Sequence, residues 1–401
     1  MNKLIGWFQG VTERGNAKKI SDIHFKDENF KKMISDLKID SLLKVTELNC
    51  EGYNFICIDE IKYFPNLEVL TIDSFDLQEL NVTFNPKLKK IDIKNSEHLT
   101  KIDFSKNTSL EILKLENLFL ENLSLRANTN LRKIVFDGLS DIDEIDLTHN
   151  MNLEELYISH MLNFNASLNE KNKRLKKIYC SYGGSCSWSE NGLPELEDLT
   201  LENAEISSID VTRLYKLKKL DLTWNQISEI NLFNNILLEE LRIGDNAFSN
   251  INLEKNINLK YLHLGGDSNR WSYEKINHDF LDLTNNTKLI ELFINSMGLS
   301  NLDLSQNLFL KKLYINENPL KSIDLSKNDL LNNLSLLNTM LEDINLSENH
   351  KLEEVQLQNN KLSSIQFPLE MKIKKMSLSK DMLDNVTIEK LLAEGFVFEK
   401  D

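Results

Sequence analysis

The pattern L-x-x-L-x-L returns along most of the chain at intervals of 21 or 22 residues. Residues 217–246 read LKKLDLTWNQISEINLFNNILLEELRIGDN, in which Leu217, Leu220 and Leu222 are followed one unit later by Leu238, Leu241 and Ile243. Fifteen units cover residues 45–372; ten have 21 residues, four have 22, and the unit at Leu259 has 30. A fixed period in this range predicts a solenoid, whose stacked turns share one continuous core.

Each unit has two halves. The first half, as in LEELYI, alternates apolar and polar residues, and this predicts a short strand with one buried face. The second half, as in SSIDVT, predicts a weaker extended segment. One turn cannot bury its own leucines, so we expect an α/β or mainly-β solenoid of short parallel strands with about fifteen coils.

The unit at Leu310, LKKLYINENPLKSIDLSKNDL, resembles the short bacterial leucine-rich repeat, sometimes called the IRREKO type. The resemblance covers about four fifths of the chain. The segment ISDIHFKDENFKKMISDLKI also resembles the N-terminal cap of secreted, internalin-like bacterial repeat proteins. This resemblance implies a horseshoe or rod with an N-terminal cap of a strand plus a short helix at 1–44, a solenoid at 45–372 and a C-terminal cap at 373–401.

Composition excludes some partners. The formal net charge of −15 argues against nucleic acid, because a phosphate backbone requires clustered Lys and Arg. No apolar run is long enough for a membrane span, and the N-terminus lacks the apolar stretch of a signal peptide. The four cysteines give no disulfide framework. We therefore expect a cytoplasmic protein, with an extracellular or cell-surface location by an unrecognised export route as the alternative.

Three columns of polar residues follow from stacking the units. An Asn closes most units and is expected to be buried, where its amide can both donate and accept hydrogen bonds. The second position alternates in sign over ten units, from Glu68 and Lys89 to Glu239 and Lys260, and we interpret this as a device that fixes the register. The fifteenth position holds Asp or Asn, as at Asp103 and Asp210, which favours local turn hydrogen bonds over a calcium site.

The fifth position of each unit points out of the first sheet, which we expect to be concave, and it is aromatic or basic in the middle of the array. With three residues of the insertion in the unit at Leu259, it gives the candidate partner-binding residues. These are Tyr157, Tyr179, Arg242, His263, Phe293 and Tyr314 at the fifth position, Tyr182 and Trp224 at the eighth, and Arg270, Trp271 and Tyr273 in the loop at 266–281. Tyr, Trp and Arg dominate the energetics of protein interfaces.

The sequence contains no metal-binding spacing, phosphate loop or nucleophile motif, so we predict no catalytic residue, no metal, no cofactor and no enzyme activity. The leading hypothesis is a scaffold that binds a protein or peptide through the concave face and the 266–281 loop. A cell-surface adhesin or carbohydrate-contacting protein is one alternative, because aromatic faces also suit sugars. An effector delivered into another cell is the other.

Overall fold

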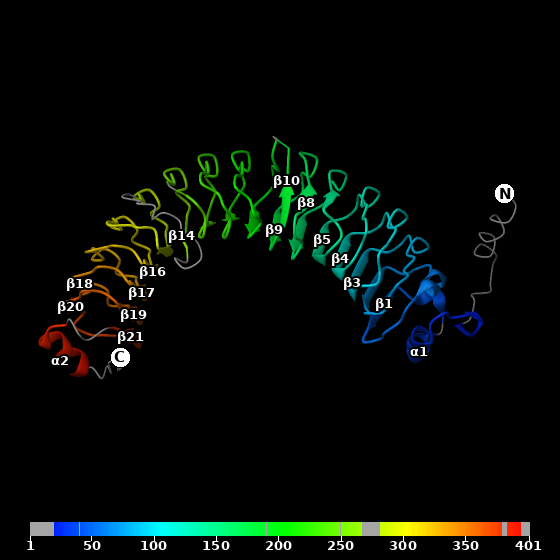
Figure 1. Cartoon of the computed structure of the whole chain (residues 1–401), viewed down its shortest axis with the longest axis horizontal. Coiled ribbons are helices and arrows are strands. Elements are labelled where there is room, and N and C mark those ends of the chain that lie inside the picture. Colours follow the sequence, from blue (N-terminus) through cyan, green and yellow to red (C-terminus); the bar gives the residue numbers. More distant parts are fainter. Residues whose placement is uncertain are drawn as a thin grey trace. The chain divides into compact units, whose positions relative to one another are not determined.

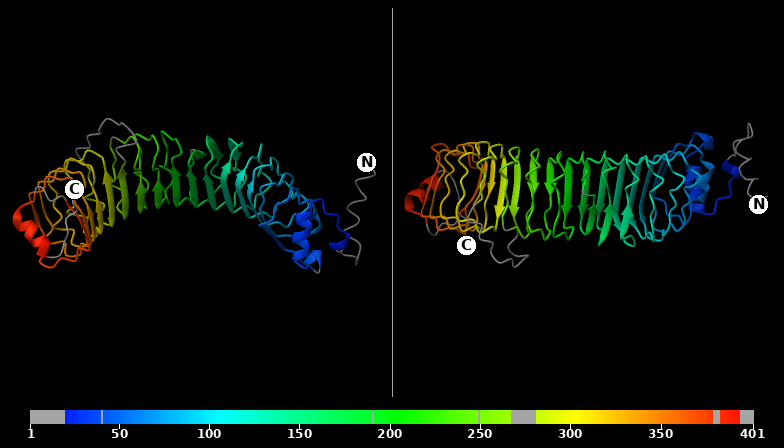
Figure 2. Two further views of the ribbon diagram at one scale, coloured as in Figure 1. Left: turned by 60° about the horizontal axis from the view of Figure 1, so that its bottom comes forward. Right: turned by 90° about the horizontal axis from the view of Figure 1, so that it is seen from above.

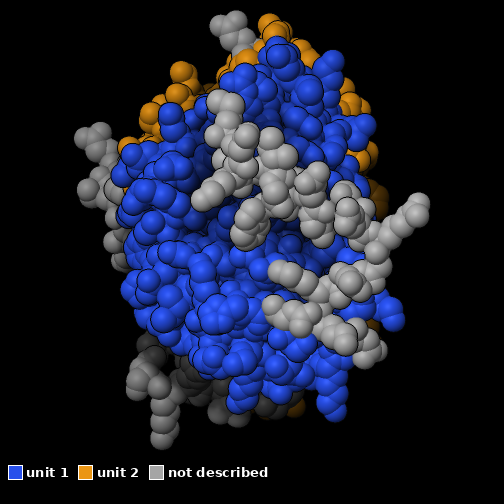
Figure 3. Space-filling view, turned by 90° about the vertical axis from the view of Figure 1, so that its right-hand side faces the viewer, with its two compact units in different colours: residues 1–175, 184–187 blue, residues 176–183, 188–401 orange. Residues whose placement is uncertain are grey.

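The computed structural model describes residues 20–39, 41–189, 191–248, 250–266, 281–378 and 383–393. The chain divides into two compact units, coloured separately in Figure 3. Unit 1 comprises residues 1–175 and 184–187, and unit 2 comprises residues 176–183 and 188–401. Each unit is a solenoid of parallel strands, so the predicted fold class is confirmed.

The described part of unit 1 contains three short 3-10 helices and one α-helix: Ile20–Asp22, α1 (Glu28–Asp36), Leu42–Lys44 and Asp59–Tyr63. Its main sheet has the strand order β1 (Glu47–Glu51), β2 (Val69–Asp73), β3 (Lys90–Ser96), β4 (Ile112–Leu118), β5 (Lys133–Leu139) and β7 (Glu155–Ser159). A second sheet holds β10 (Gly184–Ser187), β8 (Phe164–Ser167) and β6 (Glu144–Asp146) in that order. Helix α1 starts at Asp27, whose carboxylate accepts the backbone N–H groups of Asn29 and Phe30.

Unit 2 repeats the same arrangement. Its main sheet has the order β9 (Lys177–Ser181), β11 (Asp198–Glu202), β12 (Lys219–Asp221), β13 (Glu240–Arg242), β14 (Tyr261–Gly265), β15 (Glu291–Asn295), β16 (Lys312–Tyr314), β17 (Asn333–Ser335), β19 (Glu354–Gln356) and β21 (Lys375–Ser377). On the other side β18 (Asp343–Asn345) pairs with β20 (Ser364–Gln366), and helix α2 spans Asn385–Ala393. In each unit the main sheet lies on the inner side of that unit's own curve (Figures 1 and 2), so its outward face is the concave face.

The repeated leucines form the core because equal positions lie side by side. In unit 2 the parallel register places Leu220 beside Leu241, Leu241 beside Leu262, and Leu292 beside Leu313. These five leucines are at most 1% exposed. Burying one leucine side chain contributes about 1.5–3 kcal/mol to folding, and the column repeats this at every turn.

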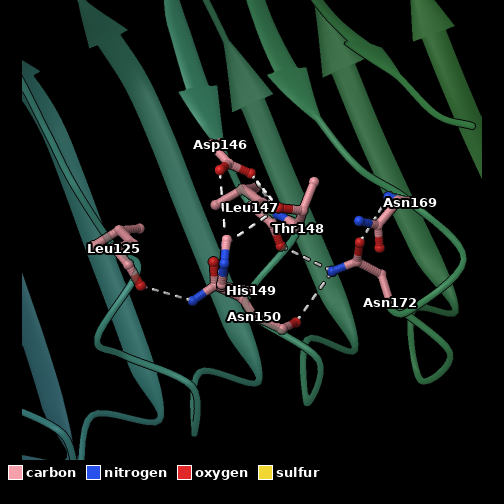
Figure 4. Close-up of polar contacts among 8 residues, drawn as sticks. All are labelled: Leu125, Asp146, Leu147, Thr148, His149, Asn150, Asn169 and Asn172. Carbon is pink, nitrogen blue, oxygen red and sulfur yellow. Dashed lines mark hydrogen bonds and ion pairs between the residues drawn. The ribbon is translucent and has the colours of Figure 1, made fainter.

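The asparagines that close the units form a buried ladder in both units. Its members are Asn85, Asn107, Asn128, Asn150, Asn172, Asn235, Asn256, Asn286, Asn307, Asn328 and Asn349, each at most 1% exposed. Figure 4 shows one step, in which Asn150 Nδ2 donates to Leu125 O at 3.0 Å and Asn172 Nδ2 donates to Leu147 O at 3.0 Å and to Asn150 O at 3.2 Å. Each of these carbonyls also accepts a backbone N–H within its own turn, so the ladder adds a second hydrogen bond that joins neighbouring turns.

Only the donor half of these amides is generally used. At Asn172 the side-chain oxygen accepts the backbone N–H of Asn169 at 2.9 Å. The oxygens of the other ten have no hydrogen-bond partner among the described residues. The interpretation that each amide both donates and accepts is therefore wrong for these ten.

The other two polar columns also form the contacts that stacking allows. At the fifteenth position Asp103 accepts the N–H of Ser105 at 2.8 Å, and Asp210 accepts both the N–H and the hydroxyl of Thr212 at 2.8 and 2.6 Å. These are the turn hydrogen bonds that the sequence predicts.

In the charge column, ion pairs join Lys89 to Glu68 (2.8 Å), Arg132 to Glu154 (3.1 Å), Lys218 to Glu197 (2.7 Å) and Lys260 to Glu239 (2.7 Å). Whether the pairs fix the register stays a prediction.

Candidate protein-binding surface

The middle residues of the strands form one continuous row on the concave face of unit 2, which we call the central row. Along the parallel register it reads Tyr179, Thr200, Asp221, Arg242, His263, Phe293 and Tyr314. Strand alternation turns these side chains away from the leucine core. The structure thus brings five of the sequence-predicted residues into one row.

Three rings of the central row pack against one another. The rings of His263 and Phe293 are tilted with centroids 5.6 Å apart, and those of Phe293 and Tyr314 are stacked at 4.4 Å with an interplanar angle of 3°. All three side chains are half-buried. Burial raises the pKa of Tyr314, so its hydroxyl is protonated at neutral pH and can donate a hydrogen bond. The stack is a flat apolar wall with a polar tip.

Glycines make room beside His263. A Cβ atom on Gly244 would lie 2.5 Å from the carbonyl oxygen of Gly265 and 3.3 Å from His263 Nε2. Gly265 has a φ of +75°, and a Cβ there would lie 1.8 Å from the carbonyl oxygen of Asn295.

Burial, followed by the charge of Arg242, lowers the pKa of His263, so the imidazole is neutral at pH 7.

Arg242 is the only cation of the central row in unit 2. Its Nε lies 2.6 Å from Glu240 Oε1 on the same strand, and its side chain is exposed. The guanidinium is therefore held by an intramolecular pair while the side chain remains exposed to solvent.

In most units the eighth residue, just past the strand, has left-handed backbone. Asn203 and Asp245 have φ values of +51° and +54°, and Tyr182 and Trp224 share this conformation with φ values of +53° and +61°. Asn tolerates this region, whereas a bulky residue rarely adopts it. Trp224 Nε1 donates to Asp245 Oδ2 at 2.8 Å, which ties the indole to the next turn. The frequent Asn at this position is the sequence signal for the backbone geometry.

Sequence reasoning missed a group of polar residues at the ends of β11 and β12. Thr200 in the central row is only 4% exposed and lies in register with Asp221. Glu202 projects from the same face of β11, since it is two residues further along. Burial, with the charge of Asp221 second, raises the pKa of Glu202. No residue type here matches a known motif, so only the spatial arrangement reveals it.

Comparison with known proteins supports the fold. No family model matches the chain, and no curated protein matches it. Among solved structures, the functional domain of InlJ from Listeria monocytogenes, which includes a cysteine ladder, is 24% identical, with a TM-score of 0.60 over 86% of this chain and 82% of that one. A leucine-rich repeat protein of Leptospira interrogans is 17% identical, with a TM-score of 0.63 over 92% of this chain and 98% of that one. This chain has the leucine-rich repeat fold.

The resemblance to internalin-like bacterial proteins is thus confirmed at the level of fold. The leucine-rich repeat fold also extends to Toll, solved in complex with Spätzle from Drosophila, which is 17% identical with a TM-score of 0.57. That match covers 80% of this chain and 53% of the matched chain.

Six of the eleven candidate residues are not members of the central row: Tyr182 and Trp224, described above, and four others. Tyr157 belongs to unit 1, where its ring accepts the ammonium of Lys133 at 4.6 Å and its hydroxyl donates to Glu155 at 3.2 Å. Arg270, Trp271 and Tyr273 lie outside the described residues. The described candidate binding surface is therefore the concave face of unit 2.

Two other features bear on function. Within the described ranges, one group of possible metal ligands is compact: atoms of Cys57, Asp59 and Glu79 all lie within 4.8 Å of one another. Lys26 Nζ lies 2.6 Å from Asp59 Oδ2, so an ammonium already pairs with one of the two carboxylates of this group. Neither described α-helix has the length and apolarity needed to cross a membrane.

Proposed function

We propose that the chain is a non-catalytic scaffold that holds a segment of a partner protein along the concave face of unit 2. The observation that carries the proposal is the wall of His263, Phe293 and Tyr314. The leucine columns fill the core without these rings, so the solenoid does not require aromatic residues at this position. Large rigid side chains at the centre of a surface are the usual anchors of protein interfaces.

The geometry favours an extended peptide. The central row runs across the strands, so a chain laid along it meets one new side chain at each strand spacing of about 4.8 Å. The row offers ring faces, a neutral imidazole and a guanidinium in succession, which suits both apolar and polar groups of one segment. The solved complex of Toll with Spätzle demonstrates that a chain of this fold can hold a protein partner.

The test uses the full chain and a library of random 12-residue peptides displayed on phage. Selected peptides are synthesised, and their affinity is measured by calorimetry for the parent and for the double variant Phe293→Ala, Tyr314→Ala. Loss of one anchor worth about 2 kcal/mol corresponds to about 30-fold weaker binding. The double variant, which removes two anchors, should therefore weaken binding by at least that factor.

The matched control is the double variant Tyr215→Ala, Phe233→Ala. These two aromatic side chains are 54% and 61% exposed and lie in the turns that close the units, away from the concave strands. The control should bind peptides like the parent. Equal losses in both double variants, or none in either, would refute the assignment of the concave face.

A further inference from the structure

Charge is distributed unevenly across the concave face of unit 2. At the starts of the strands, every described carboxylate of the third position has a cationic partner. The pairs are Asp198 with Lys177 (2.9 Å), Glu240 with Lys219 (3.6 Å), Glu291 with Lys312 (2.8 Å) and Glu354 with Lys375 (2.8 Å). These pairs neutralise that edge and leave it little net field.

The ends of β11 and β12 differ. Glu202 is half-buried, and no described residue gives its carboxylate a hydrogen bond or an ion pair. Asp221 Oδ1 accepts the N–H and the hydroxyl of Thr223 at 3.1 and 2.6 Å, and no described cation pairs with it. The seventh and eighth positions of unit 2 contain no Lys or Arg in the described part of the chain. Two neighbouring carboxylates therefore repel each other at a partly desolvated place.

A mostly buried threonine on the same face points to a ligand. Thr200 shares the outward face of β11 with Glu202 and lies in register with Tyr179 on one side and Asp221 on the other. Thr200 is only 4% exposed, and no described residue forms a hydrogen bond with its hydroxyl. The hydroxyl oxygen is not one of the fully buried unpartnered atoms, so a ligand can reach it, and with the two carboxylates it offers a set of acceptors on one face.

We propose that Thr200, Glu202 and Asp221 receive the ammonium or guanidinium group of a Lys or Arg side chain in the partner segment. The inference rests on the proposed function and names the chemistry of its partner. A cation would complete the acceptor set and end the repulsion between the two carboxylates. The backbone N–H of Tyr182 donates to the carbonyl of Glu202 at 3.1 Å, so an exposed aromatic side chain starts next to the group and can contribute a ring face to the cation.

Arg242 sets the limit of this binding place. It lies one strand beyond Asp221, in the central row, and its positive charge would repel a second cation there. The partner's basic side chain is therefore expected on the side of Tyr179 and Tyr182. The apolar side chains of the same segment would lie further along, on His263, Phe293 and Tyr314.

The experiment uses the full chain and the phage-displayed 12-residue library. Peptides recovered on the parent protein should contain Lys and Arg at least about twice as often as the unselected library. For a recovered peptide, the double variant Glu202→Gln, Asp221→Asn should lower affinity about 10-fold or more, since it removes both charges. Thr200→Val keeps the shape of the side chain without the hydroxyl and should lower affinity about 3-fold or more.

A thermodynamic cycle isolates the contact. Replacing the basic residue of the peptide by norleucine or citrulline should weaken binding to the parent but cause little further loss with the Glu202→Gln, Asp221→Asn variant. The matched control Glu254→Gln, Glu348→Gln removes two exposed charges from turns of unit 2 and should leave affinity unchanged. It separates a local contact from a general effect of net charge.

Three outcomes would overturn the inference: no enrichment of Lys and Arg, independent losses in the cycle, or binding that requires calcium and is abolished by EDTA. Peptides that depend on Phe293 and Tyr314 but not on Glu202 and Asp221 would refute the cation contact and leave the docking proposal standing. Peptides that depend on neither pair would refute both.

Discussion

The side-chain amide of Asn128 donates to the backbone carbonyl of Asn107 at 2.9 Å and to that of Phe104 at 3.0 Å. Both partners lie in the preceding turn, and Asn128 is fully buried. Neighbouring turns of the solenoid are therefore joined by a polar column in addition to the leucine core. Because Asn107 makes the same two bonds to the turn before it, the column runs from turn to turn.

Removing one rung should be costly. Asn128→Ala removes two buried hydrogen bonds between turns, although the carbonyls of Phe104 and Asn107 keep the backbone N–H groups of Asn107 and Leu110. We expect the free energy of unfolding to fall by about 1–3 kcal/mol. Guanidinium denaturation followed by circular dichroism measures this. Asn130→Ala is the control, since the exposed Asn130 donates to Thr108 from the same turn, and it should cost about 0.5 kcal/mol or less. Similar losses for both variants would contradict a structural role of the ladder.

Gly265 should not tolerate alanine. The substitution combines a φ of +75° with a Cβ 1.8 Å from the Asn295 carbonyl, so β14 and β15 would have to separate. We expect a loss of more than about 2 kcal/mol in unfolding free energy. Gly52→Ala is the control, because Gly52 has a φ of +81° but no atom within 4 Å of its Cβ position. It should cost only the left-handed penalty of about 1–2 kcal/mol, and an equal effect at both sites would refute the close approach.

The turn aspartates should make stability depend on acid. Hydrogen bonds from the Thr212 hydroxyl and N–H lower the pKa of Asp210, and the bonds from Ser105 lower that of Asp103. A lowered folded-state pKa means that the stabilisation is complete above the unfolded value of 3.8 and is lost as pH falls below it through the folded pKa. The melting temperature should therefore fall steeply below about pH 4.

The control for this acid effect comes from the chain itself. Asn231 holds the same turn with its amide oxygen, accepting the N–H of Phe233 at 3.0 Å. Replacing Asp103, Asp146, Asp210, Asp282, Asp303 and Asp324 by Asn should therefore keep the turns and flatten the melting temperature between about pH 4 and pH 2. An unchanged acid profile would show that other groups control it.

The alternating charges can be tested by exchange. Lys176→Glu with Glu197→Lys keeps the net charge but places the new Lys beside Lys218, which now pairs with Glu197 at 2.7 Å. We expect the melting temperature to fall by about 1–4 °C at low salt and the loss to shrink in 0.5 M salt, where about 4 Å of screening length remains. The exchange Lys255→Glu with Glu254→Lys, an exposed pair outside the strands, should change little. Equal behaviour of the two exchanges would contradict a role in register.

Much of the fold follows from the sequence because stacking converts a repeat along the chain into contact between equal positions. The leucines of L-x-x-L-x-L, the buried closing asparagines and the turn aspartates all occupy the environments that their columns predict. The row from Tyr179 to Tyr314 follows for the same reason. Residues at the same position of successive units pair in the parallel register, so the position in the unit decides which side chains become neighbours.

The tertiary structure alone decided how those neighbours use their atoms. It determined that ladder amides mainly donate, that Tyr182 and Trp224 occupy left-handed backbone, and that Thr200 is mostly buried beside Asp221. It also determined that the carboxylates of the third position are paired. A sequence period specifies which residues are adjacent. Burial, hydrogen-bond partners and pKa depend on the size and charge of all the surrounding side chains, and these differ from one turn to the next.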